Sequence, residues 1–196
     1  MKALVIGGAE CVWKDVAALE RMAGTWDDLV IAVNDVGVHW TRHIDHWVSL
    51  HPERLVRRDP NHPGGWPWVR QRAYNGHPNG FKTWARTASA HRITNIDETL
   101  RTWGGGSSGL LAVTVAREIG VTHLTLCGVP MTKDPHFRES QVHVKGRKWS
   151  SADSHWKAWL KVEDKLQGWV KSMSGRTRDL LGEPTAEWLE GTHAGA

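Results

Sequence analysis

Short apolar runs alternate with longer amphipathic runs along most of the chain. Continuous apolar runs predict buried strands at residues 3–6 and 29–33, and mainly apolar runs predict strands at 47–50 and 123–128. A further strand is expected around residues 91–96. Runs with helical spacing predict helices at residues 14–22, 110–119 and 153–173. Strands that alternate with helices are typical of parallel sheets whose two faces are covered by the connecting helices. The pattern therefore predicts an α/β fold with a mainly parallel sheet flanked by helices.

The same pattern predicts a single domain over residues 1–173. It contains a long loop at 57–83 and a lid-like polar loop at 129–152, which precedes a long C-terminal helix. Residues 174–196 are weakly patterned, and we expect a weakly structured C-terminal tail there. A length of 196 residues suits one domain with a substantial core. A loop as long as 57–83 is uncommon in a compact domain and is usually functional.

Composition adds one unusual feature, the choice of aromatic residue. The chain has 13 Trp but only 2 Phe and 1 Tyr. One explanation is the codon bias of a GC-rich genome, and the other is that some Trp side chains stack on a ligand. The Trp residues of the last predicted helix lie on its apolar stripe and are interpreted as core. A second group lies in or beside the loops expected to border a site, namely Trp66, Trp68, Trp84, Trp103 and Trp149.

Composition and charge also exclude several classes of protein. A hydrophobic content of 40% and a charged content of 23% suit a folded globular chain. No apolar run is long enough to cross a bilayer, and residues 1–8 lack the features of a signal peptide. Two cysteines, Cys11 and Cys127, do not make a disulfide framework, so we expect a cytoplasmic protein. The net charge of +4 fits a protein that binds an anionic ligand. It is too small to indicate the dense basic face that nucleic-acid binding needs.

The ends of the predicted strands carry the candidate binding residues. In an open parallel sheet, ligands bind beyond the carboxyl ends of the strands. The residues that follow the strands or open the 110–119 helix are Gly7, Gly8, Ala9, Asn34, Asp35, His51, Gly106, Ser107, Ser108, Gly109 and Gly128. They come from distant parts of the sequence and should meet at one edge. Their convergence predicts a ligand site at this edge of the sheet.

The run Gly-Gly-Gly-Ser-Ser-Gly at 104–109 is the most informative of these segments. Glycines allow a ligand to approach the backbone closely, and the N–H groups at a helix start favour an anion. The alternative is a plain turn with a Ser N-cap. The run lacks the Lys-Ser/Thr ending of a Walker loop, and Gly7-Gly8-Ala9 is not a full dinucleotide fingerprint. Asn34 and His51 also have two interpretations, a ligand contact or an ordinary loop start.

Histidines offer candidates for metal binding and for proton transfer. His39, His43 and His46 are close in sequence, but no Cys pair, HExxH or Asp-x-Asp accompanies them, so we expect neither a metal nor a cofactor. His143 and His155 lie in or beside the 129–152 loop. A neutral His on a loop over the strand ends is well placed to act as a general base, and a plain surface His is the alternative.

The long loop and the residues just before it are basic and aromatic. Two Trp residues, Trp66 and Trp68, stand among five arginines, Arg54, Arg57, Arg58, Arg70 and Arg72. Such a patch suits an acidic acceptor, a sugar or a base. The alternative is a solvated loop that two Trp side chains attach to the core. Nucleic acid is therefore a partner that the sequence allows but does not favour.

Together, these motifs resemble a known family. A glycine turn follows the first strand, Val33-Asn34-Asp35 follows the second, and Ser107-Ser108-Gly109 runs into Leu-Leu-Ala-Val-Thr-Val-Ala-Arg-Glu-Ile-Gly before Leu124 to Gly128. This order resembles the small bacterial sialyltransferases that use CMP-sialic acid, and related proteins such as 6-hydroxymethylpterin pyrophosphokinase-like proteins. The likeness covers residues 1–170 and is specific at 107–128. It implies a Rossmann-like fold and a metal-independent, nucleotide-sugar-dependent glycosyltransferase.

The resemblance also implies roles for individual residues. Ser107, Ser108 and Gly109 would hold the phosphate or the sugar carboxylate of the donor, and Asn34 would contact the nucleotide. His143, in the run His-Val-Lys-Gly, is similar to the lid histidine of the family and would act as general base. The expected partners are a nucleotide or nucleotide sugar and an acceptor that stays open, and a homo-oligomer is a further option.

The sequence departs from the family pattern in three places. Gly7-Gly8-Ala9-Glu10-Cys11 replaces the usual Gly-Asn-Gly-Pro-Ser, and Val129-Pro130 stands where an acidic residue is common. The family places tyrosines on the leaving phosphate, whereas Tyr74 is the one Tyr of this chain. These departures motivate two alternatives: a non-catalytic nucleotide-binding or sensor protein on the same core, and a nucleic-acid-associated transferase.

Overall fold

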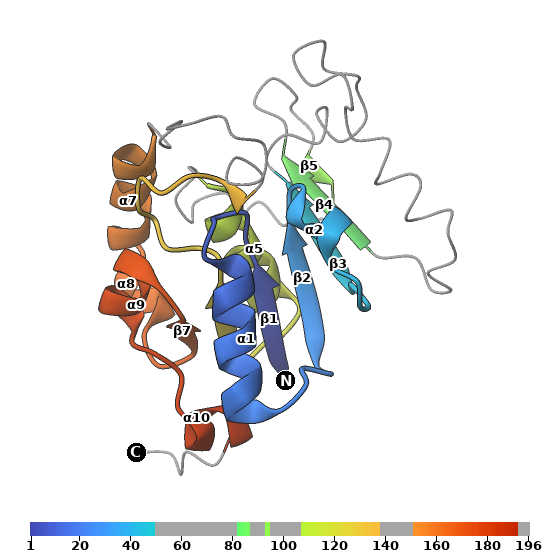
Figure 1. Ribbon diagram of the computed structural model, residues 1–196. Helices are drawn as coiled ribbons and strands as arrows, with labels where there is room; N and C mark the ends of the chain where they lie inside the picture. The colour runs from blue at the N-terminus through green and yellow to red at the C-terminus, as the bar shows by residue number, and fades with distance from the viewer. Residues whose placement is uncertain (50–81, 87–92, 95–106, 138–150, 192–196) are drawn as a thin grey trace.

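One seven-stranded sheet organises the part of the chain that the computed structural model describes, residues 1–49, 82–86, 93–94, 107–137 and 151–191 (Figure 1). The strands are β1 (Lys2–Ile6), β2 (Leu29–Val33), β3 (His46–Ser49), β4 (Lys82–Arg86), β5 (Ile93–Thr94), β6 (His123–Cys127) and β7 (Val170–Ser172). Their order across the sheet is β5-β4-β3-β2-β1-β6-β7. All neighbouring pairs are parallel except β4 and β5. The predicted α/β fold with a mainly parallel sheet is confirmed.

The order of the strands reverses at β1. From β1 the chain adds β2, β3 and β4 on one side, and it later places β6 and β7 on the other side. The connections after β1 and after β6 therefore leave the sheet next to each other, at its carboxyl edge. Such a reversal is the place where open parallel sheets usually bind their ligands.

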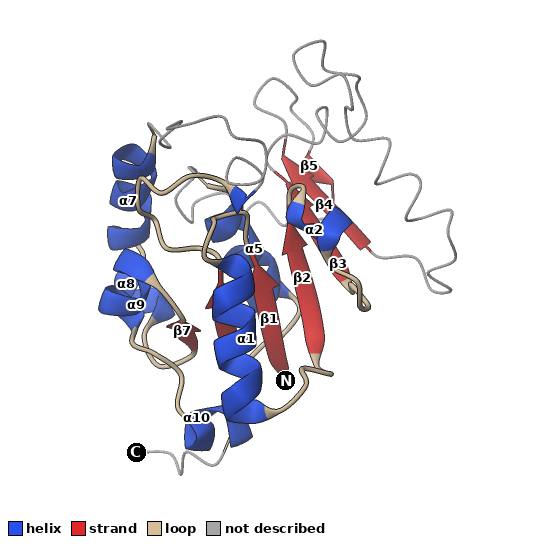
Figure 2. Ribbon diagram, in the orientation of Figure 1, coloured by secondary structure: helices blue, strands red, loops and turns tan. Residues whose placement is uncertain are grey.

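Helices cover both faces of this sheet (Figures 1 and 2). One face carries α1 (Val12–Ala23), α2 (Val36–His39) and α10 (Ala186–Glu190). The other face carries α5 (Ser108–Glu118), α7 (Ala152–Leu160), α8 (Glu163–Leu166) and α9 (Gly175–Leu181). Alternate residues of a strand point to opposite faces, so Val5 joins the α5 side whereas Leu4 joins the α1 side.

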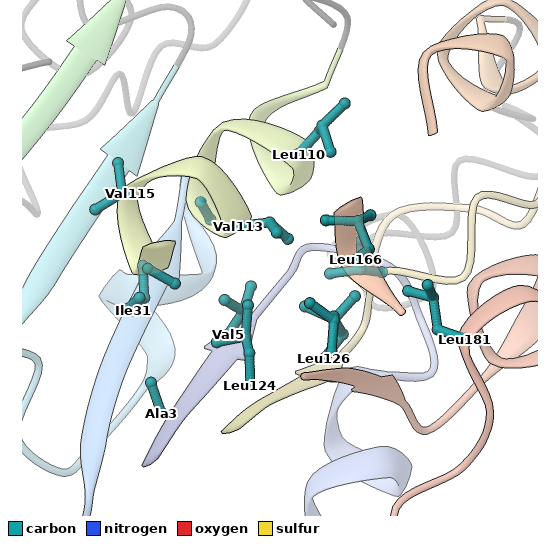
Figure 3. Packing of buried hydrophobic residues seen from close by; sticks show 14 of the residues in the cluster. Ala3, Val5, Ile31, Leu110, Val113, Val115, Leu124, Leu126, Leu166 and Leu181 are labelled. Carbon is teal, nitrogen blue, oxygen red and sulfur yellow. The ribbon is translucent and has the colours of Figure 1, made fainter. Parts of the chain in front are cut away.

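Among the described residues, the core on the α5 side contains more buried residues than the core on the α1 side. Figure 3 shows its packing, in which Val113 of α5 lies beside Val5 of the sheet. Helix α5 is buried against the sheet, and its Leu110 and Val113 are fully buried. Burial of each such side chain contributes about 1.5–3 kcal/mol of hydrophobic free energy, which fixes α5 with its first turn at the carboxyl edge.

The predicted long helix at 153–173 is wrong over its second half. Helix α7 ends at Leu160, and after the short α8 the chain becomes the extended strand β7, which pairs with β6. Gly168 has φ +84°, a left-handed conformation that ends the helical path. Trp169 is buried as predicted, but it lies in the turn just before strand β7, whose Val170 is also buried. Short apolar runs fit a helix and a buried strand equally well, which explains the error.

The weakly structured tail expected at 174–196 is likewise wrong for the residues that the structure describes. Residues of α9 and α10 pack on the sheet and on α1, and Leu181, Trp188 and Leu189 are buried. The side chain of Thr185 caps α10 by accepting a hydrogen bond from the Trp188 N–H at 3.2 Å. Residues 192–196 lie outside the described part of the chain.

Two other expectations meet the structure only in part. Strand β5 falls within the region around residues 91–96 where a strand was expected. The last two residues of the predicted 57–83 loop, Lys82 and Thr83, belong to strand β4. Residues 57–81 lie outside the described part of the chain. Of the lid-like loop at 129–152, residues 129–137 and 151–152 are described. Within the described residues, no helix has the length and apolar character needed to cross a membrane.

Candidate functional site

The carboxyl edge of the sheet collects most of the predicted site residues. Gly7, Gly8 and Ala9 follow β1, Asn34 and Asp35 follow β2, Gly128 follows β6, and Ser107 to Gly109 open α5 (Figure 2). Three predicted residues, His51, Gly106 and His143, lie outside the described part of the chain. The described residues fall into two clusters, one at the turns after β1 and β2 and the other at the start of α5.

Two of the predicted glycines allow the turns after β1 and β6 to touch. A Cβ atom on Gly7 would lie 2.3 Å from the Gly128 carbonyl oxygen, and a Cβ on Gly128 would lie 2.6 Å from the Gly7 carbonyl oxygen. Gly128 also has φ +69°, which a residue with a side chain adopts at a cost. The Gly7 N–H donates to the Cys127 carbonyl at 2.7 Å. Backbone packing alone therefore accounts for both glycines.

A buried carboxylate, Asp15 of α1, ties the turns after β6 and β7 together. Its Oδ2 accepts hydrogen bonds from the Gly128 N–H at 2.9 Å and from the Ser174 hydroxyl at 2.6 Å. The Cys11 sulfur lies 3.3 Å from the same hydroxyl. Burial raises the pKa of Cys11 to about 12 and also raises the pKa of Cys127, so both stay thiols at neutral pH. Neither cysteine is suited to nucleophilic catalysis.

Asn34 is held in a strained turn by the neighbouring strand. It has φ +54°, a conformation that Asn tolerates better than most residues. Its N–H donates to the Val48 carbonyl at 2.9 Å, and its side-chain Oδ1 accepts from the Ser49 hydroxyl at 2.9 Å. The indole N–H of Trp47 donates to the Asn34 carbonyl. These contacts account for Asn at this position as a turn residue and fix its amide at the end of β2.

The most polar contact of the edge joins the turn after β2 to the loop after β6. His136 Nε2 lies 2.9 Å from Asp35 Oδ1, and the side chains of His136 and Asp35 are 34% and 12% exposed. Gly8 lies directly beneath this contact, since a Cβ atom there would be 2.5 Å from His136 Nε2. We call these three residues the Asp35–His136 cluster. A glycine after β1 is therefore needed to admit the imidazole.

Backbone hydrogen bonds and ring packing hold His136 in this place. The Phe137 N–H donates to the Gly8 carbonyl at 3.0 Å, and the Glu10 N–H donates to the Pro135 carbonyl at 3.0 Å. The buried Phe137 ring has its centroid 4.5 Å from the His136 ring and 6.0 Å from the Trp13 ring. The loop after β6 is thus fastened across the end of β1, and Trp13 serves this packing.

The second cluster, at the start of α5, is buried. The Ser107 hydroxyl oxygen accepts hydrogen bonds from the Leu110 N–H at 3.1 Å and from the Trp159 indole N–H at 3.3 Å. Ser107 and Ser108 are both buried, and a Cβ on Gly109 would lie 2.8 Å from Val129 Cγ1. The Ser N-cap that was one of the two interpretations is present in the structure. We call Ser107, Gly109 and Trp159 the Ser107 cluster.

The histidines near β3 and α7 have other surroundings. His43 Nε2 lies 3.1 Å from Asp45 Oδ1, His46 is buried in β3, and the His39 ring packs on Phe137. Burial lowers the pKa of His155 on α7, which favours its neutral form. Over the described part of the chain, His, Cys, Asp and Glu side chains form no group of three that could hold a metal ion.

Two shallow cavities of the described chain lie away from both clusters. One, of about 330 Å³, is at the opposite edge of the sheet, where β2 begins, and its lining includes Trp26, Arg42, His43 and Asp45. The other, of about 310 Å³, is lined by Trp156, Arg176, Asp179 and Leu180 of α7 and α9. Neither contains a predicted site residue. The chemistry of the carboxyl edge is therefore the better guide to a site.

His136 was not among the site residues predicted from the sequence. Pro135-His136-Phe137 follows β6, and its place after a buried strand was a signal that could have found it. Comparisons of the chain with protein-family models, with curated proteins and with solved structures found no match.

Proposed function

We propose that this chain is a metal-independent, nucleotide-sugar-dependent glycosyltransferase-like enzyme on a Rossmann-like core. The order of the strands supports the core, because it reverses at β1 as nucleotide-binding sheets of this type do. The resemblance of residues 107–128 to sialyltransferases supports the donor class. A histidine of the segment after β6 would act as general base.

One observation carries the catalytic part of the proposal. The described part of the loop after β6 places an imidazole against a carboxylate, at the edge where parallel sheets bind ligands. A histidine paired with a carboxylate is a common means of proton transfer in enzymes. A turn that serves packing alone does not need a pair of ionisable groups. The His136 side chain of this pair is still 34% exposed to solvent.

The donor would lie beside the turn after β2, where the Asn34 amide stands at the end of the strand. The Gly8 carbonyl and the Ala9 N–H are already hydrogen-bonded, to Phe137 and Gly128, so the turn after β1 would support the site and not contact the donor through these groups. The Ser107 hydroxyl already accepts two hydrogen bonds, so we assign it to capping and give the start of α5 a secondary part in donor binding.

Ligand-induced thermal shifts test the binding part. Nucleoside mono- and diphosphates, CMP-sialic acid and other nucleotide sugars are titrated against the full chain, and the melting temperature is followed. A ligand present at 100 times its Kd stabilises the folded state by about 2.7 kcal/mol, which is a readily measured shift. If no member of the panel raises the melting temperature, the proposal is wrong.

A matched pair of variants locates the binding. Asn34→Gly removes the amide yet tolerates φ +54°, so it should reduce the ligand-induced shift while the apo protein stays folded. His43→Gln, at the opposite edge of the sheet, should keep the full shift.

Donor hydrolysis then tests catalysis. Wild-type protein is incubated with the donor that binds, and release of the free nucleotide is measured by chromatography, alongside His143→Ala. A loss of release in His143→Ala would support the general base that the resemblance implies, whereas release at the wild-type rate would exclude His143 from that role. Tight binding of the donor without turnover would favour the non-catalytic sensor protein instead. Salt-dependent DNA binding that Arg57→Ala and Arg58→Ala abolish would favour the nucleic-acid alternative.

A further inference from the structure

Two histidine–aspartate pairs occur in the described part of the chain, and they differ in place and in setting. His136 and Asp35 meet at 2.9 Å beyond the carboxyl ends of β1 and β2. His43 and Asp45 meet at 3.1 Å just before β3, at the opposite edge. The side chains of the first pair are 34% and 12% exposed, against 54% and 24% for the second. The first pair is therefore the more enclosed one and the one at the ligand-binding edge.

Three separate elements build the first pair. Asp35 comes from the start of α2, His136 from the loop after β6, and Gly8 from the turn after β1. The two backbone bonds from Phe137 to Gly8 and from Glu10 to Pro135 fix the loop that carries the imidazole. Backbone hydrogen bonds at the edge of the sheet thus fix the position of the ring.

The pair combines an imidazole, which can take up a proton, with a carboxylate. An ionised carboxylate only accepts hydrogen bonds, so Nε2 must carry a proton, and the neutral ring then has its lone pair on Nδ1. The carboxylate stabilises the imidazolium that forms when Nδ1 takes a proton. The Glu10 backbone in the adjacent turn holds the loop that carries the ring, through its N–H to the Pro135 carbonyl. A carboxylate in contact with the ring suits a base better than it suits a phosphate-binding group.

We propose that His136 is the general base of the transfer reaction and that Asp35 is the residue that positions it. This assignment rests on the proposed function and replaces His143 in that role. The acceptor hydroxyl gives its proton to Nδ1 of His136 as its oxygen bonds to the anomeric carbon of the donor. The bond from that carbon to the phosphate oxygen breaks, and its electron pair leaves with the nucleotide. His136 then releases the proton to solvent.

Steady-state kinetics with the donor that binds test the assignment. His136→Gln keeps a side-chain donor for Asp35 but removes the base, so kcat should fall by about 100-fold or more while KM and the ligand-induced thermal shift stay near wild type. Asp35→Asn should lower kcat in the same direction. His43→Gln is the matched control from the second pair and should keep wild-type kcat.

A rescue experiment separates catalysis from structure. His136→Ala leaves a space beside Gly8, and added imidazole should restore part of kcat in this variant but not raise the rate of the wild type. A merely structural histidine would show no such rescue. Wild-type kcat in His136→Gln, with a loss confined to His143→Gln, would overturn the assignment and leave the proposed function intact.

A measurement without substrate completes the test. Nitrogen-15 NMR of the wild type at mildly alkaline pH should show His136 as the tautomer protonated on Nε2, and Asp35→Asn should change that signal. A His136 protonated on Nδ1 alone would overturn the assignment whatever the activity. A protein that binds no nucleotide and hydrolyses no donor would end the proposed function, and the base assignment with it.

Discussion

The two polar clusters at the carboxyl edge are similar in residue type but differ in burial and in hydrogen bonding. Both combine glycine with polar residues at the end of a strand or the start of a helix. One contains Gly7-Gly8 and Asn34-Asp35, and the other contains Ser107-Ser108-Gly109. In the Ser107 cluster, a Trp covers the hydroxyl and satisfies it. In the Asp35–His136 cluster, two ionisable groups meet and one stays a third exposed. A hydroxyl that already accepts two hydrogen bonds stabilises the fold, whereas an accessible imidazole beside a carboxylate can transfer protons.

The largest expected loss of stability comes from a substitution that disrupts the Ser107 cluster. Trp159 is fully buried against α5, so Trp159→Ala should lower the free energy of unfolding by about 3–5 kcal/mol through the cavity it leaves. Urea unfolding measures this loss. Trp156→Ala on the same helix is the control, because Trp156 is only partly buried and should cost clearly less. Equal losses in the two variants would show that Trp159 does not hold the cluster in place.

The next effect concerns the glycines after β1. In Gly7→Ala the new methyl group meets the Gly128 backbone, and in Gly8→Ala it meets the His136 ring, which can move. Overpacking of this kind costs about 1–3 kcal/mol, and we expect Gly7→Ala at the upper end and Gly8→Ala at the lower end. Thermal unfolding of both variants checks the order. A larger loss for Gly8→Ala would mean that the loop after β6 is more rigid than the backbone turns.

Gly8→Ala also distinguishes stability from function. Because the methyl group displaces the imidazole from Asp35, donor turnover should fall more than the modest loss of stability accounts for. Turnover at the wild-type rate would show that the position of His136 above Gly8 is not needed.

A smaller effect tests whether Ser107 does anything besides capping. Ser107→Ala removes an N-cap and should cost about 1 kcal/mol, as should Thr185→Ala at the start of α10. Both are measured by thermal unfolding, with and without nucleotide. If Ser107 is only a cap, the nucleotide-induced shift is the same in the two variants. A shift reduced in Ser107→Ala alone would restore the donor-binding role that the family resemblance implies.

The smallest effect depends on pH and lies beside the Ser107 cluster, in α7. Burial lowers the pKa of His155 below its ordinary value of 6.5, so the unfolded chain takes up this proton more readily than the folded one. Stability due to the neutral imidazole is therefore full above pH 6.5 and falls as the pH drops below it. His155→Gln should lose less stability between pH 7 and 5 than the wild type. The same pH dependence in both proteins would contradict the prediction.

Particular residues show how far the sequence could be read. The runs 3–6 and 29–33 are apolar, continuous and bounded by turn residues, so their assignment as buried strands needed no tertiary information. Trp169 was expected to be buried on a helix, and it is buried, but the chain there leads into strand β7 because pairing with β6 outweighs local helical spacing. The short α9 and α10 are stabilised mainly by packing, which their sequences do not reveal.

The sequence by itself determined the α/β class, the central strands and the edge at which their polar ends gather, because each of these follows from local periodicity and from turn residues. Only the tertiary structure decided which polar groups meet there. The contact between His136 and Asp35 joins segments far apart in the chain, and it exists because Gly8 leaves room for the ring. The capping of Ser107 by Trp159 has the same origin, since a hydrogen-bond partner supplied by another element depends on packing in three dimensions.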